Sequence, residues 1–180
     1  MRARPSLHSG RGRWTAVALS VLAVALAATV STSSAAARAI AACETSGLVV
    51  WLNNQAGGAA AGSTYFKLEF TNLSGRACTL RGYPGVSAVD LRGLQLGSAA
   101  GRNPTHPSRT LTLRPGASAA SVLQIADALN YPAATCHRTT AAGLRVYPPN
   151  ETRAKTVPFP FLACARSGPT YLHIAPVEPG

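Results

Sequence analysis

Apolar and polar residues alternate in several short stretches of the later part of the chain. The clearest stretch is residues 64–71, where Phe66, Leu68 and Phe70 alternate with Tyr, Lys and Glu. This period of two predicts an antiparallel strand with one buried face. Residues 48–53 are apolar with little interruption, so we expect a strand that is covered on both faces.

Turn signals separate these stretches from further strands. Asn72-Leu73-Ser74-Gly75 has the composition of a tight turn, and the small residues at 57–62 predict a mobile loop, because glycine makes a fixed conformation costly. Residues 86–96 predict a hairpin that turns at Arg92-Gly93. Pro115-Gly116 ends a strand at 110–113.

The remaining residues continue the pattern. We interpret 117–125 as a strand, because its serines and valine favour a strand over a helix despite the alanines. Strands follow at 144–147, at 156–161, where prolines restrict the strand to a sheet edge, and at 171–177. About eight or nine short strands at this spacing predict an all-β fold, an antiparallel immunoglobulin-like β-sandwich.

An export signal precedes the β-rich part. Four arginines within the first 13 residues are followed by an uncharged apolar run at 14–30, and small residues follow at 31–37. This order is typical of a secretory signal peptide. Two cleavage frames fit, after Ala37 or after Ala41. We favour Ala41, so residues 1–41 form the signal peptide and residues 42–180 one domain. The alternative is an uncleaved signal anchor, since the run approaches the ~17–25 residues that span a bilayer.

The expected localisation is therefore secreted or extracellular, either free or associated with the cell wall. No later stretch is long and apolar enough to span, so we predict no membrane span in the mature form. Residues 40–43 (IAAC) match the lipobox of bacterial lipoproteins, in which the cysteine is lipidated. Anchoring through Cys43 is the less favoured alternative, because Arg38 and a Ser/Thr/Ala stretch separate the match from the apolar run.

All four cysteines lie beyond the apolar run, at Cys43, Cys78, Cys136 and Cys164. In an exported chain, four cysteines indicate two disulfides rather than metal ligands. Three pairings are possible in principle. We predict Cys43 with Cys78 and Cys136 with Cys164, because sequential pairing cross-links each half of the domain separately.

Several motifs carry a family resemblance. Residues 78–86 (CTLRGYPGV) are followed by 113–116 (LRPG) and 144–149 (LRVYPP). These motifs resemble an actinobacterial family of exported proteins catalogued as domain of unknown function 4232, over nearly all of the chain after the signal. The resemblance implies a secreted or cell-surface β-sandwich and supplies no biochemical role.

Residues that could carry catalysis show no recognisable arrangement. The nearest match to a serine hydrolase elbow, residues 85–89 (GVSAV), lacks the second glycine. Asp90 or Asp127 could be combined with several histidines, but the spacing selects no triad. Zinc at Cys136-His137 would need a ligand spacing that is absent. We predict no catalytic, cofactor-binding or metal site, with an unrecognised secreted hydrolase as the alternative function.

Positive charge is concentrated in one segment. Five of the 17 basic residues precede residue 42, so residues 42–180 hold 12 basic and 6 acidic side chains, a formal charge of +6. Six arginines between residues 76 and 114 stand against one acid, Asp90. A solvated face is the ordinary interpretation of such a run. The functional interpretation is a candidate anion-binding surface made by Arg76, Arg81, Arg92, Arg102, Arg109 and Arg114.

These features favour a non-catalytic binding module over an enzyme. The predicted partner is an anionic cell-envelope polymer or another exported protein, recognised through the arginines. Nucleic acid is not expected as a partner, because the domain is exported and its aromatic residues are assigned to core and turns.

Overall fold

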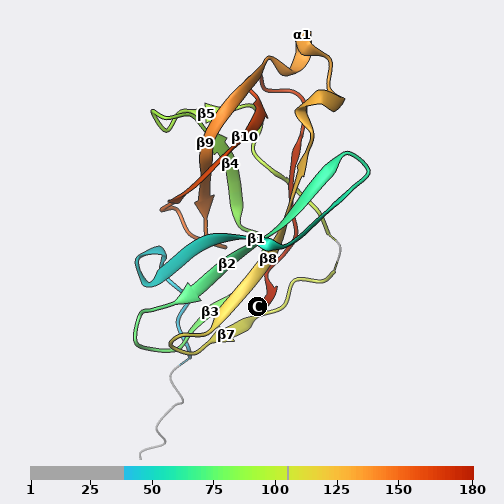
Figure 1. Ribbon diagram of the computed structural model, residues 1–180. Coiled ribbons are helices and arrows are strands. Elements are labelled where there is room, and N and C mark those ends of the chain that lie inside the picture. Colours follow the sequence, from blue (N-terminus) through green and yellow to red (C-terminus); the bar gives the residue numbers. More distant parts are fainter. Residues whose placement is uncertain (1–38, 105) are drawn as a thin grey trace, which may run out of the picture. The chain divides into compact units, whose positions relative to one another are not determined.

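The computed structural model describes residues 39–180 except Thr105 (Figure 1). The predicted signal peptide lies outside the described residues apart from its last few positions. No helix in the described part of the chain is long and apolar enough to cross a membrane.

Twelve strands and three short helical turns make up this part. The strands are β1 (Leu48–Ala60), β2 (Ser63–Asn72), β3 (Cys78–Leu80), β4 (Gly85–Val89), β5 (Gln95–Leu96), β6 (Gly101–Arg102), β7 (Leu111–Leu113), β8 (Ser118–Ala126), β9 (Arg138–Tyr147), β10 (Lys155–Cys164), β11 (Leu172–Ile174) and β12 (Glu178–Pro179). The helical turns are η1 (Thr45–Gly47), η2 (Ala128–Asn130) and α1 (Ala133–Cys136).

The strands form three sheets. The first has six strands, in the order β1-β2-β8-β11-β6, with β12 also paired to β8. The second has four strands, in the order β10-β9-β4-β5, and the third is a two-stranded ribbon of β3 and β7. All pairs are antiparallel except β11 with β6.

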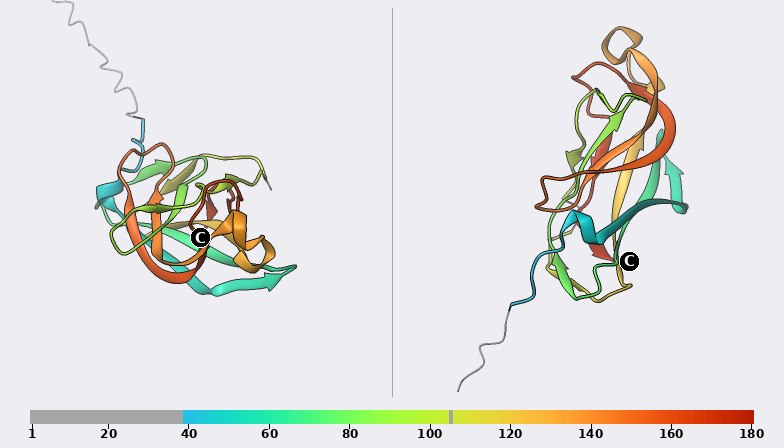
Figure 2. Two further views of the ribbon diagram at one scale, coloured as in Figure 1. Left: turned by 90° about the horizontal axis from the view of Figure 1, so that it is seen from above. Right: turned by 90° about the vertical axis from the view of Figure 1, so that its left-hand side faces the viewer.

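The core lies between the first and second sheets. β8 runs through the middle of the first sheet, and its inward residue Leu123 is fully buried, as is Phe70 on β2. Leu144 and Val146 of β9 belong to the same hydrophobic cluster. In Figure 2 the orange strands β9 and β10 lie against the yellow β8 and the teal β1–β2 hairpin. The predicted all-β antiparallel sandwich is confirmed.

The prediction of a loop at residues 57–62 is wrong. β1 continues to Ala60 and pairs with β2, which begins after a two-residue turn. Ala61 and Gly62 have φ values of 50° and 72°, as a type I′ hairpin turn requires. The register shifts between Asn53 and Gly58, so a bulge accommodates the extra residues. Cross-strand pairing therefore orders a glycine-rich stretch whose composition favours a loop.

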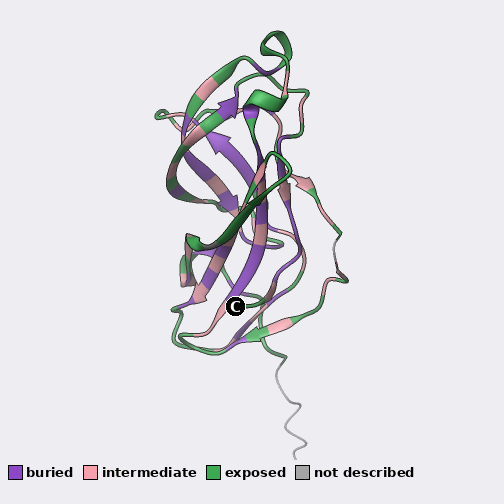
Figure 3. Cartoon of the chain, turned by 45° about the vertical axis from the view of Figure 1, so that its right-hand side comes forward, coloured by how far each residue is buried: buried purple, intermediate pink, exposed green. Residues whose placement is uncertain are grey.

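The expectation that residues 48–53 are covered on both faces is also wrong. β1 is the edge strand of the first sheet, and Leu48 is buried whereas Val49 and Trp51 are 45% and 40% exposed. Figure 3 shows exposed segments along this hairpin and at its end. The continuous apolar run thus contributes one face to the core and presents the other to solvent.

Both disulfides have the predicted sequential pairing. Cys43 is bonded to Cys78, and Cys136 is bonded to Cys164. The first joins the segment before η1 to β3, and the second joins α1 to the end of β10. No cysteine in the described part of the chain is free. A zinc site at Cys136-His137 would therefore lack its thiolates, and lipidation of Cys43 would require a thiol that the disulfide occupies.

The chain before Cys43 is already part of the fold. Ala42 forms a parallel bridge with Thr79, whose backbone N–H donates to the Ala41 carbonyl at 2.8 Å. The Cys43 N–H donates to the Thr79 carbonyl at 2.9 Å. Residues 41–43 therefore lie along β3, and the predicted boundary at Ala41 falls inside this pairing.

A chain shortened to begin at Ala42 loses the acceptor for the Thr79 N–H. We expect its free energy of unfolding to be about 1–2 kcal/mol below that of a chain beginning at Arg38. Urea unfolding followed by tryptophan fluorescence measures both. Identical midpoints would show that the Ala41 contact is dispensable.

Tyr171 makes stability depend on alkaline pH. Its side chain is fully buried, and its hydroxyl donates to the Leu96 carbonyl at 3.3 Å. Burial raises the pKa of Tyr171 from 10.0 to about 12. The unfolded chain thus loses this proton at a lower pH than the folded chain does, so the stabilisation is complete below pH 10 and is lost as pH rises toward 12.

We expect the free energy of unfolding to fall by up to about 1.4 kcal/mol per pH unit in this window from Tyr171 alone. Urea unfolding at a series of pH values measures the slope. Tyr171→Phe should unfold with a shallower slope than the parent chain, and equal slopes would contradict the assignment.

Candidate anion-binding surface

All six predicted arginines are exposed, but they do not form a single patch. The β3–β7 register pairs Cys78 with Leu113 and Leu80 with Leu111. Each end of the ribbon is therefore flanked by two arginines. Arg76 and Arg114 flank one end, and Arg81 and Arg109 flank the other. We call these four residues the ribbon arginines.

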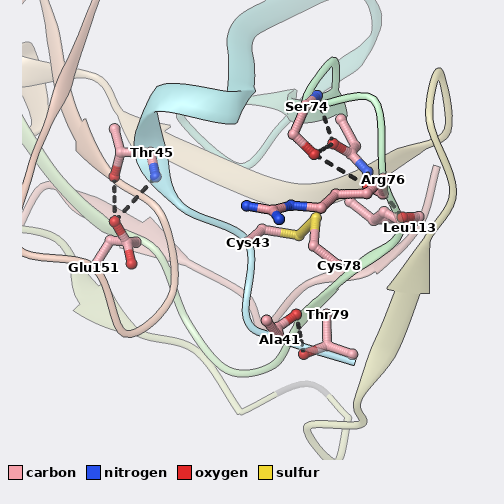
Figure 4. Close-up of a disulfide and its surroundings, with 10 residues drawn as sticks. Ala41, Cys43, Thr45, Ser74, Arg76, Cys78, Thr79, Leu113 and Glu151 are labelled. Atoms are coloured by element: carbon pink, nitrogen blue, oxygen red, sulfur yellow. Dashed lines mark hydrogen bonds between the residues drawn. A yellow bond between two sulfur atoms is a disulfide. The ribbon is translucent and has the colours of Figure 1, made fainter. Parts of the chain in front are cut away.

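A buried amide fixes the end that carries Arg76 and Arg114. Asn72 is fully buried at the end of β2, and its Nδ2 donates to the Arg76 carbonyl at 2.8 Å and to the Leu113 carbonyl at 2.9 Å. Its Oδ1 accepts from the Ser74 N–H at 3.0 Å and from the Ser74 hydroxyl at 2.7 Å. Figure 4 shows Ser74, Arg76 and Leu113 gathered at this point. One side chain thus holds together the chain segments that carry both arginines.

The Cys43–Cys78 disulfide borders the same end of the ribbon. Figure 4 shows the Arg76 side chain extending past this disulfide. A depression of about 650 Å³ is lined there by Arg76, Cys78, Glu44 and residues 39–42, among others. Arg76 therefore faces a hollow that residues 39–42 help to form.

The other end of the ribbon also has an acidic neighbour. The Asn150 side chain donates to the Arg81 carbonyl at 3.0 Å, which holds the backbone there. Arg109 lines a pocket of about 390 Å³ together with His106 and Glu178, whose side chains approach to 3.5 Å. Positive charge at this end is partly offset by Glu178.

The guanidinium groups of the ribbon arginines are without partners in the described part of the chain. Within the described residues, no hydrogen bond or ion pair involves the guanidinium of Arg76, Arg81, Arg109 or Arg114. Each guanidinium has five N–H donors and is always charged at physiological pH. The four groups are therefore available to an external acceptor.

Arg92 is separate from this group. It lies in the β4–β5 turn, where its guanidinium pairs with Asp90 at 3.2 Å. Backbone N–H groups, first that of Leu94, together with Arg92 lower the pKa of Asp90. Figure 1 places β5 and the β3–β7 ribbon toward opposite ends of the domain. Arg92 and Asp90 thus organise the hairpin.

Arg102 has an intermediate position. Its guanidinium carbon lies over the Tyr83 ring, 5.3 Å from the centroid, in cation–π contact. Both residues line a pocket of about 330 Å³ that also contains Glu151. The carboxylate of Glu151 accepts from the Thr45 N–H and hydroxyl. Arg102 is thus engaged with an aromatic ring beside an acid.

The residues considered for catalysis have other contacts. Asp127 caps η2, His106 approaches Glu178, and the His173 ring contacts the Thr170 carbonyl at 3.1 Å. In the described part of the chain, neither aspartate considered for a triad is bonded to a histidine. The same residues contain no group of three or more His, Cys, Asp or Glu placed to hold a metal ion.

Asn72 is the residue of this site that sequence reasoning missed. The composition around it indicates only the start of a turn. One signal in the sequence could have indicated that Asn72 is buried. Asn72 continues the alternation of the inward-facing residues Leu68 and Phe70 along the strand. A polar residue at a buried position of a strand must find hydrogen-bond partners.

These features define a class of protein, an all-β sandwich domain with two disulfides and an arginine-flanked ribbon. The family model described as Domain of unknown function (DUF4232) matches residues 43–178, so the chain belongs to this family. The comparison with curated proteins and the comparison with solved structures each gave no match.

Replacing Asn72 tests the buried amide. Asn72→Ala removes both donors and the acceptor and leaves the buried Leu113 carbonyl without that partner, so we expect a loss of about 3 kcal/mol in the free energy of unfolding. Ser74→Ala, at an exposed neighbour, should cost about 1 kcal/mol or less. Urea unfolding of both variants decides between them, and equal losses would argue against a central role for Asn72.

Proposed function

We propose that this domain is an exported, non-catalytic binding module that holds an anionic envelope polymer along the ribbon arginines. The observation that carries the proposal is the set of four exposed guanidinium groups that flank one short ribbon without a partner among the described residues. Carboxylate and phosphate groups match the guanidinium fork in geometry and charge. A repeating anion would supply the acceptors that the fold does not.

The spacing of the arginines favours a polymer over a small anion. Five residue steps separate Arg76 from Arg81, which span at most about 17 Å when the chain is extended. A single small anion contacts one end of the ribbon at a time. A chain of repeated charges contacts both ends, and each contact brings the next one within reach.

Export is supported by two independent features. The arginine-then-apolar order of the first 30 residues is typical of a signal peptide. Two disulfides are typical of proteins in oxidising compartments outside the cytosol. We propose a secreted or extracellular location, free or held at the cell wall through the bound polymer. The disulfide of Cys43 favours this over a lipid anchor.

Binding without catalysis is supported by the contacts of the candidate acids and bases. Asp90 organises the β4–β5 turn, and Asp127 caps η2. Catalytic acids and bases need a shared position within reach of a reacting atom. The proposed mechanism is therefore electrostatic capture, with Asn72 positioning one end of the ribbon.

The test compares two variants that lose the same charge. Arg76→Gln with Arg109→Gln removes one arginine from each end of the ribbon. Arg92→Gln with Arg166→Gln removes two arginines near β5 and α1, away from the ribbon in Figure 1. Immobilised polyphosphate and polygalacturonate serve as phosphate and carboxylate probes.

We expect the parent chain to bind a probe at 0.01 M salt and to lose it as the Debye length falls from about 30 Å to about 3 Å at 1 M. The ribbon variant should bind roughly tenfold more weakly, and the control variant should bind within about threefold of the parent. If both variants bind equally weakly, binding depends on the net charge of the domain and not on the position of the ribbon arginines. If neither probe binds at low salt, the proposal of an anionic polymer is overturned, and an acidic protein becomes the partner to test.

A further inference from the structure

The outer face of the first sheet carries an exposed indole among polar side chains. The register sets Trp51 beside Glu69 and Asn53 beside Lys67, and all four alternate with core residues, so they point away from the core. Tyr65 lies farther along β2 on the same face. We call Trp51, Asn53, Tyr65, Lys67 and Glu69 the Trp51 face.

Polar groups beside the indole are held in place. Asn53 Nδ2 donates to Glu69 Oε1 at 3.0 Å, across the strand pair. The Gln55 N–H donates to Asn53 Oδ1 at 3.1 Å. Amide and carboxylate thus have defined positions next to the ring of Trp51, and the Lys67 ammonium adds donors from the neighbouring strand position. The Trp51 face therefore combines the flat apolar surface of one indole ring with hydrogen-bond donors and acceptors in fixed positions.

The composition of the face argues against a protein partner. A stable protein interface buries about 800 Å² on each side, with an apolar centre from which charged residues are depleted. Here Glu69 lies directly beside Trp51 and Lys67 lies beside Asn53, one position farther along the same face. Val49 is the one large exposed aliphatic side chain next to Trp51 among the described residues of β1. The charges of Lys67 and Glu69 also cancel, so the face does not select an anion.

A neutral sugar matches these groups. One face of a pyranose ring presents C–H groups that stack on an indole, and its rim presents hydroxyls that both donate and accept. We infer that the Trp51 face binds a neutral polysaccharide, with a pyranose stacked on Trp51 and its hydroxyls bonded to Asn53, Glu69 and Lys67. Tyr65, about 14 Å from Trp51 along the sheet, provides a second contact for a chain of several sugars. This site is separate from the ribbon arginines and does not rest on the proposed function.

The chain supplies its own reporter for this site. Its two tryptophans are Trp14, in the predicted signal peptide, and Trp51. A chain beginning at Arg38, the start of the compact unit Arg38–Gly180, therefore fluoresces from Trp51 alone among its tryptophans. A stacked sugar removes water from the indole, so emission should shift to shorter wavelength and quenching by acrylamide should fall.

The experiment titrates this chain with cellohexaose, chitohexaose, mannohexaose and xylohexaose up to about 10 mM. We expect a saturable emission shift with at least one of them. Calorimetry then compares variants that are shown to be folded by urea unfolding followed by circular dichroism, because the Trp51 variants lack the fluorescent indole. Trp51→Ala and Glu69→Gln should each weaken binding about tenfold, and Trp51→Phe should retain part of it.

Two control variants locate the bound sugar on the Trp51 face. Leu162→Ala removes a side chain that is 41% exposed on β10, in the other sheet, and should leave sugar binding unchanged. The Arg76→Gln with Arg109→Gln variant should also bind sugar as the parent does, which distinguishes this inference from the proposed function. No emission shift with any hexasaccharide would overturn it. So would a shift that depends on protein concentration without sugar, because a second copy would then cover Trp51.

Discussion

The structure depends on satisfying one buried amide. Asn72 stands where β2 leaves the core, and its side chain bonds the entry to β3 and the exit from β7. Its backbone N–H also donates to Ala117 just before β8, and its carbonyl accepts from Gly116. A buried polar group without partners costs about 1–3 kcal/mol, so the ribbon must dock where these bonds form. Arg76 and Arg114 are brought together as a result.

Two disulfides cross-link the domain at separate places. Cys43–Cys78 holds residues 41–43 against β3, beside the backbone bond between Ala41 and Thr79. Cys136–Cys164 ties α1 to the end of β10, an edge strand. Each disulfide joins a segment outside the sheets to a strand. The interior strands are held by core packing and pairing.

The two proposed binding surfaces have opposite physical characters. The ribbon arginines offer unpaired positive charge on a narrow element, which suits a flexible polyanion and should be sensitive to salt. The Trp51 face offers a flat sheet surface with one indole and locally balanced charge, which suits an uncharged ring. A polymer of the cell envelope can present both chemistries, as charged groups attached to sugars. The two surfaces are nevertheless tested by different variants and different probes.

Local pattern in the sequence was enough for the strand type, the all-β class, the sequential disulfides and the family, because period two, turn residues and cysteine spacing are read along the chain. Tertiary structure alone decided that 57–62 joins a hairpin, that β1 is an edge and which carbonyls the Asn72 side chain bonds. It also separated Arg92 from the ribbon arginines. The sequence places all of them between residues 76 and 114, and this proximity along the chain was the reason for grouping them. These outcomes depend on which strands become neighbours, and strand pairing joins residues whose separation along the chain carries no local signal.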